Sequence, residues 1–283
     1  MIQPIIANKE VTRHILKTFN IHMSKKLGQN FLIDEGIVNE IVHAADIQEG
    51  DLVLEVGPGI GTLTQGLAEA KAKVVAVELD NRLPEVLAKT LEGYGNIEIV
   101  HGDILKVNIP EITGGNKFKV VANLPYYITT PIIMALLEQR LPVTRLVTMV
   151  QKEVAERMVA KPGKKDYGAL SVAVQYYTSP QIVAAVPPKS FIPAPEVDSV
   201  VIRCDVREKP AVEVLNEKMF FRVVKAAFSQ RRKTLNNALK NTGVSVEIIQ
   251  SVLAEKQIDG TRRGETLSLD EFAQIADGLF QKI

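Results

Sequence analysis

The sequence lacks several features that would place it outside the ordinary intracellular proteins. Of its 283 residues only one is a cysteine, Cys204, which excludes an internal disulfide and fits a reducing compartment, so we expect a cytoplasmic protein. No apolar run approaches the roughly 18 residues of a membrane-spanning helix. Residues 1–10 lack a charged start followed by an apolar core and a cleavage site, so we expect no secretory signal.

The sequence also lacks a large excess of charge of one sign. The formal net charge is +1 at pH 7, so any binding to nucleic acid must come from a local patch. The four histidines and one cysteine show no metal-ligand spacing, and we expect no metal site. The length is sufficient for one large α/β domain and a smaller one, and 46% hydrophobic and 24% charged residues are ordinary for a soluble globular protein.

A short apolar stretch followed by a polar turn is the most informative feature. Residues 120–122 are Val-Val-Ala, which predicts a strand buried on both faces of a parallel sheet. The strand must end at the following Asn123-Leu-Pro-Tyr126, because Pro125 has no N–H and disfavours the helical conformation of the residue before it. From residue 128 the apolar spacing is helical. Such a turn lies at the carboxyl edge of an open α/β sheet, where ligands bind.

The chemistry of this turn suits a planar ring with an exocyclic amino group. The side-chain carbonyl of Asn123 and the main-chain carbonyl of Pro125 are two acceptors, and the ring of Tyr126 lies beside them in the sequence. Adenine has the matching donors and π face. Two acceptors would localise the lone pair of its N6 and make it nucleophilic, without a covalent step. The alternative is an ordinary turn in which Asn123 caps the next helix.

Glycines follow an earlier predicted strand, at residues 52–56. Gly57, Gly59 and Gly61 form a G-x-G-x-G loop that lets a ligand approach main-chain N–H groups. Glu78 ends the next predicted strand, residues 73–80, where a carboxylate can hold ribose hydroxyls in a nicotinamide enzyme or in an S-adenosylmethionine enzyme alike. A surface carboxylate is the alternative for Glu78.

A third predicted strand, residues 96–100, is followed by Asp103, which could accept from an adenine amino group. Gly57, Glu78, Asp103 and Asn123 thus follow four successive strands. This recurrence is more specific than any one of the residues, and it predicts a single site at the carboxyl edge of the sheet.

Two other segments are candidates for closing that site. Residues 1–33 contain an apolar pattern typical of a short helix and then Lys25 and Lys26, with a glycine and two amides before Phe31, which indicates either a loop that closes over a ligand or a solvated arm. Phe191 is held between turns by two prolines and could stack on a base, or it could be an ordinary core residue.

The pattern becomes helical to the end after about residue 206, which predicts a boundary there. Between Glu217 and Glu247 the chain has no acidic residue. This span is either a solvated face or a contact surface for RNA phosphates. Its cations are Lys218, Arg222, Lys225, Arg231, Arg232, Lys233 and Lys240.

Eight motifs in order extend this pattern over nearly the whole chain. They are Leu27-Gly-Gln-Asn-Phe-Leu32, Glu55-Val-Gly-Pro-Gly-Ile-Gly61, Val77-Glu-Leu-Asp80, Gly102-Asp-Ile104, Asn123-Leu-Pro-Tyr-Tyr127, Gln151-Lys-Glu-Val-Ala-Glu-Arg157, Phe191-Ile-Pro-Ala-Pro-Glu-Val-Asp-Ser199 and Phe228-Ser-Gln-Arg-Arg-Lys-Thr-Leu235. The sequence with these motifs closely resembles the KsgA-type (RsmA-type) small-subunit ribosomal RNA adenine N6,N6-dimethyltransferases, relatives of the erythromycin-resistance rRNA methyltransferases.

The resemblance implies an α/β fold, a Rossmann-like class I S-adenosylmethionine-dependent methyltransferase sheet with a small all-helical C-terminal domain. The expected division is an arm and cofactor-closing loop in residues 1–33, the methyltransferase domain in 34–206 and a helical RNA-binding domain in 207–283. The implied substrate is a pair of adjacent adenines in a hairpin loop near the 3′ end of 16S rRNA in the immature small ribosomal subunit. We expect a monomer that binds neither membrane nor metal.

The resemblance also implies residue roles. S-adenosyl-L-methionine would contact Gln29, Asn30, Leu32, Gly57, Gly59, Glu78, Asp103 and Asn123. Asn123 and the Pro125 carbonyl would hold the target amino group between the rings of Tyr126 and Phe191. RNA would contact Lys218, Arg222, Lys225, Arg231, Arg232 and Lys233. Two alternatives remain open, a DNA adenine methyltransferase and an RNA-binding assembly factor.

Overall fold

The computed structural model describes residues 4–24, 27–230 and 232–283. The chain divides into two compact units, Met1–Ala155 with Gln181–Val206, and Glu156–Pro180 with Arg207–Ile283. Residues 156–180, which the sequence analysis placed with the sheet, therefore group with the C-terminal helices. The reason is that helix α8 (Ala169–Tyr177) packs on α9 (Glu217–Phe228), the first of the C-terminal helices.

The first unit is built on a seven-stranded sheet in the order β4-β3-β2-β5-β6-β9-β7. Strands β2 to β6 pair in parallel, and β9 is antiparallel to β6. The seven strands are β2 (Leu52–Val56), β3 (Lys73–Glu78), β4 (Ile97–His101), β5 (Phe118–Asn123), β6 (Val143–Gln151), β7 (Thr178–Val186) and β9 (Ser199–Val206). This is the α/β sheet expected from the sequence.

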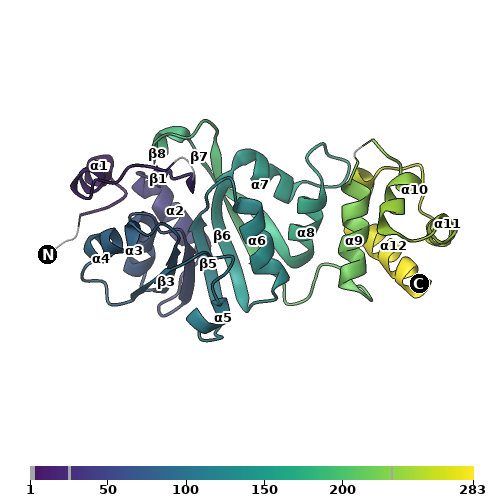
Figure 1. Cartoon of the computed structure of the whole chain (residues 1–283), viewed down its shortest axis with the longest axis horizontal. Coiled ribbons are helices and arrows are strands. Elements are labelled where there is room, and N and C mark those ends of the chain that lie inside the picture. Colours follow the sequence, from purple (N-terminus) through teal and green to yellow (C-terminus); the bar gives the residue numbers. More distant parts are fainter. Residues whose placement is uncertain (1–3, 25–26, 231) are drawn as a thin grey trace. The chain divides into compact units, whose positions relative to one another are not determined.

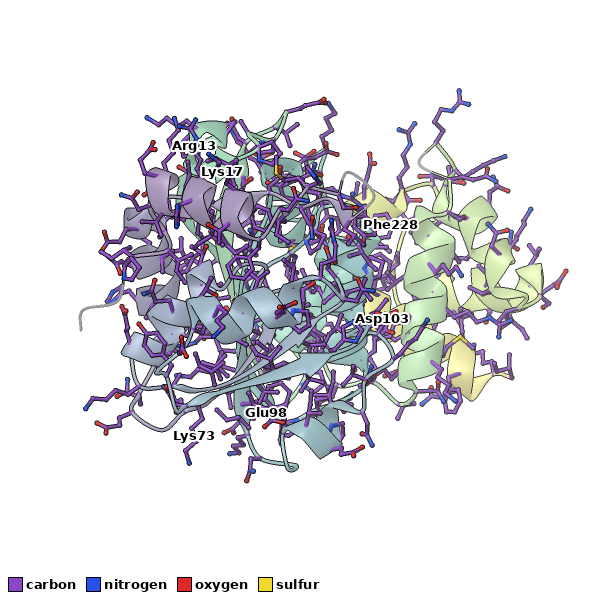
Figure 2. All side chains as sticks on the ribbon, turned by 60° about the vertical axis from the view of Figure 1, so that its left-hand side comes forward. Arg13, Lys17, Lys73, Glu98, Asp103 and Phe228 are labelled. Carbon is purple, nitrogen blue, oxygen red and sulfur yellow. The ribbon has the colours of Figure 1, made fainter. Side chains whose placement is uncertain are left out.

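The strand order changes direction beside β2. The chain runs outward from β2 to β3 and β4 and then returns to β5 on the other side of β2. In open α/β sheets, ligands bind at such a switch point, outside the carboxyl ends of the strands. Figure 2 shows Lys73, the first residue of β3, and Asp103, which follows β4, at opposite ends of the sheet.

Helices and a small second sheet complete this unit (Figure 1). Strands β1 (Phe31–Leu32) and β8 (Phe191–Ile192) form the second sheet and pair antiparallel. The helices are α1 (Lys9–Thr18), α2 (Glu35–Ala45), α3 (Thr62–Glu69), α4 (Leu83–Thr90), α5 (Ile109–Ile112), α6 (Thr129–Glu138) and α7 (Lys152–Val159), the last of which continues into the second unit. Asp34 caps α2 by accepting from the Ile37 N–H, as its position predicts.

The core explains why the central strands read as continuous apolar runs. Val120, Val121 and Ala122 in β5 have no exposed surface, because neighbouring strands and helices cover both faces of the sheet. The N-terminal arm is packed as well: Ile6, Ile15 and Leu16 lie in one hydrophobic cluster with residues of α4 such as Leu87. This part of the arm is therefore not a solvated extension. Lys25 and Lys26 lie outside the described residues.

The second unit consists mainly of helices, which Figure 1 shows in teal to yellow. The ring of Tyr176 stacks on Phe220, with centroids 4.8 Å apart, and Tyr167 meets Phe228 edge to face. Among the described residues, no helix combines the length and apolar character that crossing a membrane requires. The elements of the second unit are α8 (Ala169–Tyr177), α9 (Glu217–Phe228), α10 (Leu235–Ala238), α11 (Val246–Glu255), α12 (Leu269–Gln281) and the short 3-10 helices Leu239–Thr242 and Gly264–Thr266.

Candidate active site

A cavity in the first unit collects the residues that follow four successive strands. Its walls include Gly57 after β2, Glu78 at the end of β3, Asp103 after β4 and Asn123 at the end of β5. The lining also contains six other residues of the predicted site, Gln29, Asn30, Leu32, Gly59, Pro125 and Tyr126. Phe191 is the one residue of the predicted cofactor and substrate site that is not in the cavity lining.

The glycine loop presents open backbone to the cavity. Gly57 has φ +69°, and a Cβ added there would meet no atom within 4 Å, so the space beside it is free. Gly59 has φ +63°, and a Cβ added there would lie 3.2 Å from the ring of Phe31. Both positions therefore require glycine, one for its conformation and the other also for a close approach to the arm.

Glu78 is buried, with 5% of its surface exposed, so it is not a surface carboxylate. Its two oxygens accept from the main-chain N–H groups of Gly59, at 3.1 Å, and Asp80, at 2.8 Å. Each oxygen retains a second lone pair that can accept from a hydroxyl. Burial raises the pKa of this carboxyl group, while the two N–H bonds oppose the rise.

Glu55 is a cavity residue that the sequence analysis did not single out. It lies within β2, is 1% exposed, and its Oε2 has no hydrogen-bond partner among the described residues. Burial raises its pKa to about 8, with a further contribution from the charge of Glu78 and an opposing one from Thr64. The available signal was one acidic residue within an otherwise apolar strand.

Asp103 is the most exposed carboxylate among the cavity residues. Its side chain is 29% exposed, and Oδ1 accepts from the N–H of Leu105 at 3.0 Å, which shapes the turn after β4. Its Oδ2 lies 3.7 Å from the Nζ of Lys106, which is 83% exposed. A screened pair of this kind contributes little stability and leaves Oδ2 accessible.

Asn123 does not cap the helix that follows. Helix α6 begins after Ile128, which makes no side-chain capping bond, so the ordinary-turn alternative is wrong in this respect. The Nδ2 of Asn123 instead donates to the main-chain carbonyl of Asn30, at 3.1 Å. Because a carbonyl can only accept, this bond fixes the orientation of the amide and directs Oδ1 away from Asn30.

The Pro125 carbonyl is more heavily bonded than the sequence analysis assumed. It accepts from the N–H of Ile128, at 3.2 Å, and from the hydroxyl of Thr129, at 3.0 Å. These two bonds hold the turn and use both lone pairs of the oxygen. A ligand amino group would therefore have to share or replace one of them.

The two predicted ring contacts have different environments. Tyr126 lines the cavity, and its hydroxyl lies 2.5 Å from the Oγ of Ser199, a buried residue that begins β9. Burial raises the pKa of Tyr126, and the bond to Ser199 opposes the rise. Phe191 is 3% exposed and lies in a hydrophobic cluster with Leu32 and Val186. Phe191 is thus packed as a core residue in this structure.

The amide of Gln29 is bonded within the protein. Its Nε2 donates to Oδ2 of Asp80, at 2.8 Å, and its Oε1 accepts from the N–H of Ser24, at 2.9 Å. The Asn30 side chain donates to the carbonyl of Gly28, at 3.2 Å. The bond between Gln29 and Asp80 joins the arm to the loop after β3, and the other two bonds lie within the arm.

The predicted RNA-binding cations lie in the second unit. Lys218, Arg222 and Lys225 are exposed on one face of α9, since their spacing of four and three residues matches the helical period. Arg232 and Lys233 follow α9 and are also exposed. Arg231 lies outside the described residues. No group of three or more metal-binding side chains occurs among the residues that the structure describes.

Comparisons with known proteins agree with this geometry. The family model "Ribosomal RNA adenine dimethylase" matches residues 5–280. The chain is 50% identical to the "Ribosomal RNA small subunit methyltransferase A" of Alkaliphilus oremlandii, over 98% of this chain and 99% of that protein.

Solved structures show the same fold. A dimethyladenosine transferase from Plasmodium falciparum matches with a TM-score of 0.75 and 30% identity, covering 87% of this chain and 95% of that one. The 23S rRNA methyltransferase ErmE matches with a TM-score of 0.69 and 27% identity, covering 89% and 100%. The α/β sheet is thus that of the class I methyltransferases, and the chain belongs to the ribosomal RNA adenine dimethylase family.

Proposed function

We propose that this protein transfers methyl groups from S-adenosylmethionine to N6 of two adjacent adenines in a hairpin loop near the 3′ end of 16S rRNA, during biogenesis of the small ribosomal subunit. Family membership supports the reaction class. The observation that carries the proposal is the Asn123 amide at the cavity wall, bonded through Nδ2 so that Oδ1 remains available as an acceptor. The adenine amino group has the donors that this acceptor requires.

The cavity suits an adenosine cofactor. Glu78 has lone pairs for ribose hydroxyls, Asp103 has an accessible oxygen for an adenine amino group, and Gly57 leaves room for the ligand beside its backbone. The unpartnered Oε2 of Glu55 adds a polar atom on the same wall, and because a pKa of about 8 keeps this carboxyl group protonated at neutral pH, it can donate as well as accept. When bound, S-adenosylmethionine supplies an electrophilic methyl group attached to its sulfonium. The leaving group is a neutral thioether, which needs no protonation by an acid. Gln29, Asn30 and Leu32 would close the cavity from the arm.

Asn123 activates the target nitrogen by accepting a hydrogen bond from one of its N–H groups. That bond would draw the lone pair of N6 out of the ring and orient it toward the methyl group that the cofactor supplies. The Pro125 carbonyl takes the second N–H after exchanging its bond with Ile128 or Thr129. No strong general base is required, because the alkylated nitrogen is acidic enough to lose its proton to water.

Two rings hold the adenine after it leaves its stack. Tyr126 already lies in the cavity wall and is held by Ser199. Phe191 completes the clamp when its ring turns out of the hydrophobic cluster with Leu32. A base in an unpaired loop lowers the cost of extrusion, which favours a hairpin substrate.

The function is tested with unmethylated small subunits, methyl donor and mass spectrometry of the rRNA. Wild-type protein should add four methyl groups, two on each adenine. Asn123→Ala should lower the rate of methyl transfer by about 10³-fold, since it removes the hydrogen-bond acceptor that orients the N6 lone pair. RNA binding should stay within a few-fold of wild type. Full activity of Asn123→Ala would contradict the proposal. Duplex DNA is offered in parallel, and preferential methylation of DNA would favour a DNA adenine methyltransferase instead.

The exposed cations of the second unit are proposed to contact RNA phosphates. We expect Arg231→Ala/Arg232→Ala/Lys233→Ala protein to bind unmethylated small subunits with a shallower dependence on salt. Each lost phosphate contact should reduce the slope of log K against log salt by about 0.7 for single-stranded RNA. Equilibrium binding at several salt concentrations measures the slope, and an unchanged slope would remove these residues from the RNA surface.

A further inference from the structure

Three consecutive residues of the N-terminal arm contact either the end of β5 with the turn after it, or the loop after β3. A Cβ added to Gly28, at φ +59°, would lie 3.3 Å from the ring of Tyr127, so only a glycine backbone packs this closely on the turn after β5. Gln29 donates to Asp80 at the end of β3, and the Asn30 carbonyl accepts from the amide of Asn123. The arm therefore touches both the predicted cofactor side and the predicted substrate side of the cavity.

The bond between Asn30 and Asn123 decides what the catalytic amide presents to a substrate. If the Asn123 amide rotated by half a turn, its NH₂ would face the adenine amino group, and two donors cannot bond to each other. The Asn30 carbonyl prevents this, because it can pair only with Nδ2. The productive orientation of Asn123 thus depends on where the arm places one main-chain oxygen.

That main-chain oxygen is fixed by a chain of bonds that leads to Arg82. The neighbouring Gln29 is held by Asp80, whose carboxylate is buried, with 4% of its side chain exposed. Arg82 binds both oxygens of Asp80, through Nε at 2.9 Å and Nη2 at 2.6 Å. The same guanidinium donates from Nη1 to the carbonyl of His22 in the arm, at 3.1 Å.

This arrangement makes Arg82 a clamp between the arm and the end of β3. Its two-pronged pairing is rigid, because a planar guanidinium matches a carboxylate at two points. Arg82 is the main reason that the pKa of Asp80 is lowered to about 2, so the clamp stays charged at neutral pH. Arg82 is not in the cavity lining, and its side chain is 41% exposed. Its removal would therefore delete no side chain of the cavity lining.

We propose that Arg82 is a positioning residue for methyl transfer, acting through Asp80, Gln29 and the Asn30 carbonyl on the orientation of the Asn123 amide. This inference rests on the proposed function, since it gives the amide a reaction to serve. It predicts that loosening the arm slows the methyl-transfer step itself, beyond any effect on cofactor affinity.

The kinetic test compares Arg82→Ala with wild-type full-length protein on unmethylated small subunits, in single turnovers saturated with S-adenosylmethionine. The rate constant should fall about ten-fold, because small misplacements at a reacting centre are costly. Dissociation constants for the subunit should not change. Arg82→Lys should recover part of the rate, since a lysine can pair with Asp80 but lacks the fork.

Lys89→Ala is the matched control. Lys89 is an exposed cation on α4, and its Nζ lies 4.0 Å from a carboxylate oxygen of Glu92. Its removal takes away one positive charge from the helix that Arg82 precedes, and the rate should match that of wild type. This separates the clamp from a general effect of charge.

A spectroscopic readout makes the inference independent of activity. In ¹⁵N-labelled protein, the side-chain NH₂ signals of Asn123 are identified by their loss in Asn123→Ala. They should shift and exchange faster with solvent in Arg82→Ala, and stay unchanged in Lys89→Ala. This readout stands even if the wild-type protein fails to methylate adenine, so failure of the function and failure of the clamp are distinguishable.

Three results would overturn the inference. One is a wild-type rate in Arg82→Ala. Another is a loss confined to the KM for S-adenosylmethionine with an unchanged rate at saturation, which would limit the clamp to cofactor binding. The third is a slowed rate with unchanged Asn123 signals, which would show that Arg82 acts by another route.

Discussion

The carboxyl groups at the two edges of the central sheet differ in their partners. At the amino-terminal edge, Arg145 binds Asp205 at 2.6 Å and Asp46 at 3.2 Å, and Lys119 binds Asp51 at 2.7 Å. At the carboxyl edge, Glu55 has an unpartnered oxygen and Glu78 is bonded only to main-chain N–H groups among the described residues.

The pKa shifts of Asp51, Glu55 and Glu78 follow this division, whereas Asp80, which follows β3 and pairs with Arg82, has a pKa lowered to about 2. The pKa of Asp51 is lowered, because hydrogen bonds from Lys119 and Gln48 outweigh the effect of burial. Burial raises the pKa of both Glu55 and Glu78, and no cation among the described residues opposes the rise. The amino-terminal edge thus uses its charges to hold the fold together. At the carboxyl edge the Asp80–Arg82 pair holds the arm, while Glu55 and Glu78 keep polar atoms available for a ligand at a cost in stability.

The largest expected effect is at the carboxyl edge, where Glu55→Gln should remove a pH-dependent loss of stability. Burial gives Glu55 a pKa of about 8 in the folded protein, against an ordinary value of 4.5. The folded state therefore holds a proton that the unfolded state has released, and the free energy of unfolding falls as pH rises from about 5 to about 8.

Relative to wild type, Glu55→Gln should gain about 3 kcal/mol between pH 5 and pH 8, since one pKa unit corresponds to about 1.4 kcal/mol. Urea unfolding of the ligand-free protein at several pH values measures this. Glu98→Gln, at an exposed position on β4, is the control and should follow the wild-type curve. If the free energy of unfolding depended on pH in the same way for Glu55→Gln and wild type, the proposed difference between the two edges would be wrong.

A smaller effect is expected at the amino-terminal edge. Arg145→Ala removes the cation that Asp205 and Asp46 share, leaves Asp205 with Arg203 alone, and deletes a side chain that is only 16% exposed. The free energy of unfolding should fall by about 2 kcal/mol, below the value for a fully buried pair because Asp205 is 42% exposed.

The contrast is sharpened by measuring activity in the same variant. Arg145→Ala should keep the methyl-transfer rate of wild type per folded molecule at 25 °C, since Arg145 lies at the edge of the sheet away from the site. A loss of rate without loss of stability would show that the two edges are coupled, and the division of roles would be wrong.

Much of the fold and of the site could be predicted because both depend on local patterns. Short apolar runs indicated the strands, and glycine or polar residues after each run indicated the carboxyl edge, which is where Gly57, Glu78, Asp103 and Asn123 lie. Parallel strands bring such positions together without any knowledge of the loops. The resemblance to a known family supplied the reaction and the substrate.

The features that were not predicted depend on contacts between distant parts of the chain. The bond between Asn123 and Asn30 joins residues 93 positions apart, and nothing local indicates it. Glu55 lies within strand β2, and the apolar pattern that predicts the strand does not indicate that this one acidic residue lines a cavity. Phe191 was expected to face a ligand, but in this structure its ring fills the core beside Leu32, since a proline-bounded loop does not specify where its aromatic side chain points.

The pairing of Phe31 with Ile192 and of Leu32 with Phe191 also fixes when the site can form during synthesis. A ribosome produces the arm first and β8 only after six of the seven strands of the central sheet. A nascent chain can therefore fold the glycine loop and the Asn123 turn while the arm still has no strand to pair with. The arm's contacts with α4, Arg82 and Asn123 can form earlier, so the pairing with β8 is the last of these anchors to form, and a product terminated before residue 191 would lack it.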